Sequence, residues 1–305
     1  TKVLFKIYMA FTVCAFIIFL ICGMDFTGAV NHALSTVSAG GFSTYNESAA
    51  YFDDVYVEGW MTFFMVLAGG NFGLYYRAYH KGAAVLLKDT EFKAYLSILV
   101  VAAIIIIGDL MVELDSDFFT ALRYAAFQTA SIATTGFVSA DYDRWPVLSK
   151  FVLMGLMICG GCAGSTAAGL KISRVVILFR SVKSTVLHLL YPKHVVEVMM
   201  NGTTLHDSTV LRVGQYFFMY IFFILFFALL LAFDGVGGFD ALGISVSTIG
   251  CIGPAFGVTG ATCTYADLSW FSKTVICFSM LLGRLEIFTI LVMLRPGLWK
   301  GKNTW

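Results

Sequence analysis

Six hydrophobic segments of about membrane-spanning length divide this chain, and a shorter apolar stretch containing glycine lies within each successive pair. A helix needs ~20 residues to cross a bilayer core. The predicted spans are 3–22, 59–76, 94–112, 151–170, 213–233 and 270–294. The stretches between them, too short and too rich in small residues to span, are 28–42, 118–137 and 238–257. We therefore expect an all-α membrane protein with repeated helix, pore-loop, helix units.

The composition excludes other classes of protein. With 59% hydrophobic residues, 13% charged residues and a mean hydropathy of +0.83, the chain is too apolar for a soluble globule. A net charge of +1 argues against a nucleic-acid partner, which needs a clustered basic surface. The seven cysteines lie mostly in apolar stretches, so we expect no disulfide framework. Cys159 and Cys162 form a CxxC, but no second pair completes a zinc site.

The short stretches share one pattern, in which a small residue stands six positions before a glycine. It occurs as Ser35 to Gly41, Ala130 to Gly136 and Ser247 to Gly253. Irregular backbone is tolerated at membrane depth only where it faces protein or a water-filled cavity. Backbone carbonyls beside such a cavity can replace the hydration shell of a cation. The pattern therefore predicts three filter segments around an aqueous axis, and ordinary tight turns between helices are the alternative.

The basic residues indicate the orientation in the membrane. Those assigned to the cytoplasmic side are Lys2, Lys6, Arg77, Lys81, Lys88, Lys93, Lys171, Arg174, Arg180, Lys183, Lys193, Arg295, Lys300 and Lys302. The opposite side carries most of the carboxylates, including Asp25, Glu58 and Asp234, so the pore loops open outward beneath an acidic rim. Retention of positive charge inside explains most of this asymmetry, and a rim that attracts cations is a further hypothesis.

Segment 160–169 places four glycines in the middle of a hydrophobic span. Glycine is unfavourable inside helices, so we expect the helix to break here, although close packing through small residues is an alternative. The spacing from Gly164 to Lys171 does not match a phosphate-binding loop, and no strand precedes it. Ser165 has no histidine base in an apolar span, so we expect no enzyme.

Arg284 and Glu286 fall near the centre of the last predicted span. A charge inside the membrane is costly and by default functional. The alternative is a mutual or interhelical ion pair that only stabilises the bundle.

These motifs carry a family resemblance. The three re-entrant segments, the run from Gly160 to Lys171 and the sequence Gly283-Arg284-Leu285-Glu286 together resemble the Trk/Ktr/HKT superfamily of potassium transporters. Within it the chain is most similar to the bacterial Trk-system membrane subunits (TrkH-like). The resemblance covers essentially the whole chain, because several separate motifs occur in the same order.

The resemblance implies potassium uptake through a gated filter lined by carbonyls, with potassium bound only at the filter residues. Those residues would be Val37, Ser38, Ala39, Gly40, Gly41, Ile132, Ala133, Thr134, Thr135, Gly136, Ile249, Gly250, Cys251, Ile252 and Gly253. An intramembrane loop would obstruct the pore below them and move to open it, with Arg284 in contact. The gating residues would be Cys162, Ala163, Gly164, Ser165, Thr166, Ala167, Ala168 and Arg284.

The resemblance also implies four repeats around one pore, of which we count three: 1–88, 89–208 and 209–305. We expect the first repeat to lie upstream. Further implications are a multi-pass protein of the bacterial inner membrane, a homodimer in contact with lipid, and no organic cofactor. A cytoplasmic ring of nucleotide-binding regulatory subunits (TrkA-like) would dock on 77–93, 172–208 and 295–305. A cation symporter coupled to sodium or protons is the alternative function, and an intramembrane hydrolase is a third class.

Overall fold

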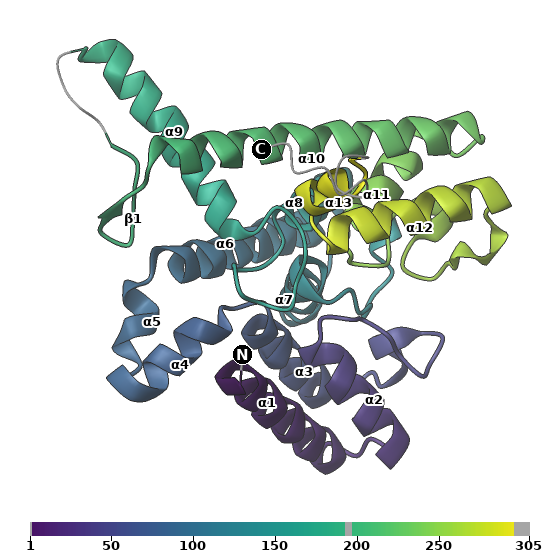
Figure 1. Cartoon of the computed structure of the whole chain (residues 1–305). Helices are drawn as coiled ribbons and strands as arrows, with labels where there is room; N and C mark the ends of the chain where they lie inside the picture. The colour runs from purple at the N-terminus through teal and green to yellow at the C-terminus, as the bar shows by residue number, and fades with distance from the viewer. Residues whose placement is uncertain (1, 193–196, 296–305) are drawn as a thin grey trace.

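The computed structural model describes residues 2–192 and 197–295, and their regular secondary structure is almost entirely helical (Figure 1). This confirms the all-α class. The exception within the described ranges is a small antiparallel hairpin of β1 (Met199–Met200) and β2 (Thr203–Thr204). An Asn201-Gly202 turn joins the two strands, and both residues have the positive φ that such a hairpin turn requires.

Three groups of helices follow the same order of long helix, short helix, extended segment and second helix. The first comprises α1 (Lys2–Ile21), α2 (Phe26–Val37) and α3 (Val55–Ala68). The second comprises α6 (Thr90–Glu113), α7 (Phe118–Thr134) and α8 (Val147–Cys159), and the third α10 (Asp207–Phe233), α11 (Gly238–Ile249) and α12 (Trp270–Arg284). The first group lies at the bottom of Figure 1, the third at the top and the second between them. The repeat boundaries stay a prediction.

The short helix of each group begins at a polar or glycine cap and ends in a turn. Asp25 accepts a hydrogen bond from the Gly28 N–H at 3.0 Å and so caps α2, and Asp117 caps α7 in the same way through Phe119. Buried faces of these helices pack against their longer neighbours, with Ala15 and Phe19 of α1 meeting Ala33 of α2 in one apolar cluster. The short helices therefore stand inside the bundle rather than at its edge.

Three of the predicted spans are not continuous helices. By length and composition, the described residues contain three helices that can cross a membrane, α1, α6 and α10. The pair α12 and α13 (Ile287–Met293) qualifies only jointly and bends by 106°. The helix predicted over 59–76 ends at Ala68 because Asn71 caps a new helix, α4 (Phe72–Lys81). The helix predicted over 151–170 ends at Cys159, before Gly160 with its φ of 70°.

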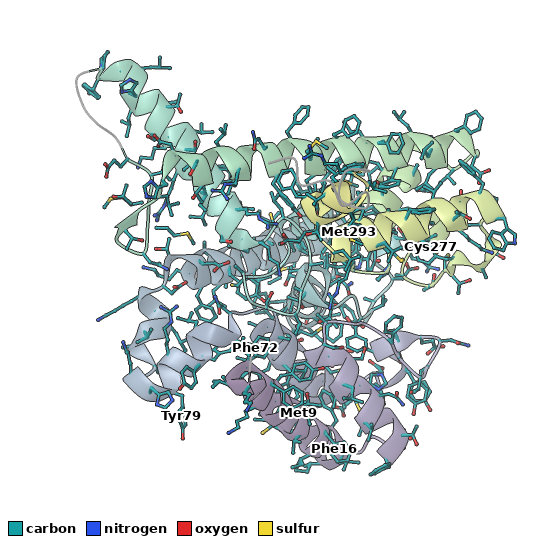
Figure 2. The ribbon with its side chains drawn as sticks, in the orientation of Figure 1. Met9, Phe16, Phe72, Tyr79, Cys277 and Met293 are labelled. Carbon is teal, nitrogen blue, oxygen red and sulfur yellow. The ribbon has the colours of Figure 1, made fainter. Side chains whose placement is uncertain are left out.

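Four short 3-10 helices, Ser48–Tyr51, Tyr142–Arg144, Gly257–Thr259 and Tyr265–Asp267, lie in the extended segments of the three groups. The remaining α-helices lie on the predicted cytoplasmic side. They are α5 (Ala84–Lys88) and α9 (Ile172–Leu190), which projects from the body at the upper left of Figure 1 before the chain returns through the hairpin. This agrees with a linker that contains an amphipathic helix. Exposed apolar side chains cover the outer faces of the bundle, as Met9 on α1 and Cys277 on α12 illustrate (Figure 2). Such faces suit a lipid environment.

Candidate ion filter and intramembrane loop

The three predicted filter segments come together in space. A side chain at Gly41 would overlap the backbone carbonyl of Thr135, so the first segment lies directly against the second. A side chain at Gly136 would in turn overlap the carbonyl of Ile252, in the third segment. Successive segments are about a hundred residues apart in sequence. The first segment nevertheless contacts the second, and the second contacts the third, in each case through backbone atoms. This is the arrangement that a ring of carbonyls needs.

Each segment turns at a glycine with a left-handed conformation. The φ values are 69° at Gly41, 97° at Gly136 and 109° at Gly253. Other residues rarely adopt such values, which explains why glycine recurs at these places. Ala39 and Cys251, two positions before the first and third of these glycines, also have positive φ, at 56° and 52°. The first and third segments therefore share a tighter turn that the second lacks.

Three buried serines hold the segments, and of these the sequence pattern included Ser35 and Ser247 but not Ser131. The carbonyls of Ser35, Ser131 and Ser247 each accept from the backbone N–H five residues later, at 2.8 to 3.0 Å. The Ser35 hydroxyl accepts from the Phe42 N–H at 2.6 Å, whereas that of Ser131 donates to the Phe137 carbonyl at 2.6 Å. The Ser247 hydroxyl contacts the carbonyls of Gly253 and Pro254.

The serines also correct the register of the repeated pattern. Ser35 and Ser247 stand six positions before their glycines, but in the second segment the structural serine is Ser131, five positions before Gly136. The second segment is thus one residue shorter, which fits its single positive-φ residue. An equal offset in sequence therefore hid a difference in turn geometry.

Many of the predicted rim carboxylates stabilise the outer loops. Asp25 also accepts from the Tyr45 hydroxyl at 2.7 Å, and the bonds from the Gly28 N–H and from Tyr45 lower the pKa of Asp25. The hydroxyls of Ser269 and Ser272 likewise lower the pKa of Asp234. These carboxylates cap helices or bind side chains of the outer loops. Their position is therefore explained without a role in attracting cations.

One basic residue that the orientation argument left out lies among these outer carboxylates. Arg123 on α7 makes a bidentate contact with Glu58 on α3, at 2.7 and 2.9 Å, and also reaches Asp53 at 2.8 Å. The Glu58 side chain is only 3% exposed. This pair fixes the second short helix to the first turn of α3.

The loop 160–169 crosses beneath the first filter segment. The Cys162 N–H donates to the Gly69 carbonyl at 2.8 Å, so the loop follows the end of α3. The Thr166 hydroxyl donates to Val37 at 3.0 Å and lies 3.3 Å from Ala68, both through backbone carbonyls. Gly160, Gly164 and Gly169 all have positive φ. The expected break in the helix is therefore present.

Two cationic side chains bind successive carbonyls of this loop. Arg284 donates from Nη1 to the Thr166 carbonyl at 3.2 Å, and Lys171 donates from Nζ to the Ala167 carbonyl at 2.6 Å. Arg284 ends α12 rather than lying in the middle of a continuous span. Glu286, at the bend, pairs with Arg174 of α9 at 2.8 Å. Of the alternative of a mutual or interhelical ion pair, the mutual form is therefore wrong, and Glu286 makes an interhelical pair. The Arg174 guanidinium also lies over the Tyr216 ring.

Within residues 2–192 and 197–295, no group of three or more His, Cys, Asp or Glu side chains is placed to hold a metal ion. Any bare cation here would meet carbonyls and hydroxyls, which are the hard oxygen ligands that such ions prefer.

Comparison with known proteins gives a consistent result. The TrkH family, described as cation transport protein, matches residues 1–302. The chain is 34% identical to the Trk system potassium uptake protein TrkH of Halomonas elongata, over 98% of this chain and 62% of the relative. It is 30% identical to TrkG of Escherichia coli, over 99% and 62%. The crystal structure of the potassium transporter TrkH from Vibrio parahaemolyticus superposes with a TM-score of 0.91 at 30% identity, covering 98% of this chain and 64% of that one. The chain thus spans slightly less than two thirds of the length of these relatives.

Proposed function

Because this chain belongs to the TrkH family of cation transport proteins, we propose that the full-length protein takes up potassium through the three converging filter segments. The observation that carries the proposal is the contact of Gly41 with Thr135 and of Gly136 with Ile252, because it brings three bare backbones around one axis. Stacked carbonyl rings at matched geometry compensate a potassium ion for its lost water. We assign the bound ion to the carbonyls within 37–41, 132–136 and 249–253.

A fourth segment would complete the ring. The side of Gly253 that a Cβ would occupy is open, with no described atom within 4 Å, whereas Gly41 and Gly136 each face a neighbouring segment. The relatives are longer than this chain. We propose that another repeat of the full-length protein packs against Gly253, and that the chain divides into the repeats 1–88, 89–208 and 209–305.

The loop acts as the gate in this proposal. Residues 162–168 lie beneath Val37 and are held by Arg284 through the Thr166 carbonyl. A positive charge beside the path also opposes a cation in a medium of low dielectric constant. Opening requires the loop to move away from both contacts.

The assembly follows from the family. The chain is a multi-pass protein of the bacterial inner membrane, and its family transports ions rather than catalysing a reaction. We propose a homodimer with one pore in each protomer, regulated by a cytoplasmic ring of nucleotide-binding subunits. Residues 77–93 and 172–208 offer the docking surface. Of the third predicted docking segment, 295–305, residues 296–305 lie outside the described residues.

Coupled symport is the less favoured function. The carboxylates nearest the spans are engaged: Asp109 accepts from the backbone and hydroxyl of Ser149, and Glu286 pairs with Arg174. A proton relay needs a carboxylate that exchanges protons along the path.

The test is reconstitution of the full-length protein in vesicles, with flux and reversal potential measured for potassium against sodium. We expect passive current that reverses close to the potassium equilibrium potential. Movement of potassium against its gradient, driven by sodium or protons, would establish the symporter. Absence of any flux from folded protein would refute transport.

A further inference from the structure

A buried carboxylate at the start of α6 joins the two ends of the segment that contains the loop. Glu91 is 5% exposed. Its Oε1 accepts from the backbone N–H of Ala163, within the loop, and from that of Ser173 at 3.1 Å, in the first turn of α9. One oxygen atom therefore fixes the loop and the helix that leaves it to the same point on α6.

The charge of Glu91 suits this position. The first turn of α9 presents unpaired N–H groups and the positive end of the helix dipole, which favour an anion. Hydrogen bonds to an ionised acceptor are about twice as strong as neutral ones. Glu91 has no basic partner among its hydrogen bonds, so removing it would leave two backbone donors without their acceptor. Glu91 therefore holds the loop through buried hydrogen bonds, not through a surface ion pair.

The residues just before Glu91 are held by the cytoplasmic hairpin. Asn201, at the turn between β1 and β2, accepts from the Thr90 N–H at 2.7 Å through Oδ1 and donates to Asp89 Oδ2 at 2.9 Å through Nδ2. Asp89 caps α6 through the Phe92 N–H. The tip of the hairpin is therefore bonded to the two residues immediately ahead of Glu91.

We propose that Glu91 is the positioning residue that keeps loop 160–169 seated under the filter, and that the hairpin 199–204 controls it from the cytoplasmic side. The inference rests on the proposed role of the loop as a gate. A partner that pulls the hairpin away from α6 shifts residues 89–91, weakens the bonds to Ala163 and Ser173, and frees the loop. The path from the surface to the gate consists of two hydrogen bonds from Asn201 to residues 89 and 90, the chain to Glu91, and the bond from Glu91 to Ala163.

The test uses Cys162, a free and fully buried thiol inside the loop, as a reporter of loop position. The full-length protein is treated with a maleimide, and labelling of each cysteine is followed by mass spectrometry, with exposed Cys263, in the segment between α11 and α12, as the internal reference. We expect Glu91→Ala to raise the labelling rate of Cys162 by about tenfold, because the charge-assisted bonds no longer oppose opening. Glu91→Gln keeps an acceptor without its charge and gives a smaller rise.

Two further variants complete the design. Glu113→Ala removes an exposed carboxylate from the opposite end of α6 and leaves Cys162 protected. Asn201→Gly removes the side chain but keeps a residue that tolerates the φ of 51° at this turn, and it raises Cys162 labelling less than Glu91→Ala does.

The outcomes separate this inference from the proposed function. Unchanged Cys162 labelling in both Glu91 variants, with Cys263 labelled normally, overturns the role of Glu91. Unchanged labelling in Asn201→Gly alone overturns the role of the hairpin. Increased labelling supports the inference even if potassium flux does not rise, and that combination contradicts the proposal that the loop is the gate.

Discussion

The Thr166 hydroxyl donates to the Val37 carbonyl at 3.0 Å, which links the intramembrane loop to the first filter segment across 129 residues of sequence. The same residue offers its own carbonyl to Arg284. Thr166 therefore lies between the filter and the cation that holds the loop, and a change at this residue reports on both.

Replacement of this hydroxyl should loosen the loop. Thr166→Val keeps the shape of the side chain but loses the donor, at a cost of about 1 kcal/mol, or roughly fivefold in the opening equilibrium. We expect a comparable rise in basal potassium flux without regulatory subunits in vesicles. Thr274→Val, on the exposed face of α12, is the control, because its hydroxyl bonds only within its own helix. Equal flux in the two variants would show that the bond to Val37 does not restrain opening.

The filter glycines should tolerate no side chain. Gly136→Ala places a Cβ onto the Ile252 carbonyl, and Gly41→Ala places one onto Thr135, each at a positive φ. Strain of about 1 to 3 kcal/mol at each site is expected to push the segments apart and reduce the preference for potassium over sodium, measured by reversal potential. Gly59→Ala on α3 has open space and serves as the control. Normal selectivity in both filter variants would show that these glycines serve only to form turns.

Arg284 and the loop should act as one barrier. Deletion of 162–168 and Arg284→Ala should each raise basal flux. Because Arg284 reaches the loop through the Thr166 carbonyl, the double variant should conduct little more than either single variant. Flux is measured in vesicles with matched protein content. A gain in the double variant equal to the product of the single gains would mean two independent barriers.

The ion pair between Glu58 and Arg123 should contribute strongly to stability. Glu58→Gln leaves the guanidinium without its buried charged partner, and loss of one partner of a buried pair costs about 3 to 5 kcal/mol. Asp53→Asn removes the other, 80% exposed partner of Arg123 and should change little. Thermal unfolding in detergent compares the two, and a similar Tm for both variants would contradict the burial argument.

The cap of the first short helix should respond to acid. Hydrogen bonds from Gly28 and Tyr45 lower the pKa of Asp25 below its ordinary value of 3.8, so its charge stabilises the fold above that value. The contribution is lost as the pH falls through the lowered pKa. Asp25→Asn keeps a capping side chain, so its Tm deficit relative to the natural protein should shrink on acidification below about pH 4. Asp267→Asn corrects for general charge effects, and a deficit that is constant with pH would refute the assignment.

The sequence predicted those features that local patterns encode. Glycine at positions 41, 136 and 253 marked the turns, because left-handed backbone favours glycine. The glycines of 160–169 marked the break, because glycine is unfavourable inside a helix. The all-α class followed from apolar segments alone. The family resemblance implied that Arg284 contacts the loop, and Arg284 binds the Thr166 carbonyl.

The features that the sequence missed depend on distant contacts. The partner of Glu286 is Arg174, 112 residues away, and not the neighbouring Arg284. Glu91 looked like an ordinary acidic residue at the start of a helix until its oxygen was seen between Ala163 and Ser173. Ser131 was missed because the equal offset to glycine pointed to Ala130 in the second segment, where Ser131 makes the bonds. A long apolar run likewise does not reveal the bend of 106° after Arg284.

The contacts of the loop also impose an order on biosynthesis. Val37 and Glu91 leave the ribosome early, but Arg284 is made more than a hundred residues after Thr166. The last group of helices carries Ile252, whose carbonyl lies against Gly136, as well as Arg284, which binds the Thr166 carbonyl of the loop. Insertion of that group therefore brings the third segment against the second and Arg284 against the loop in the same step.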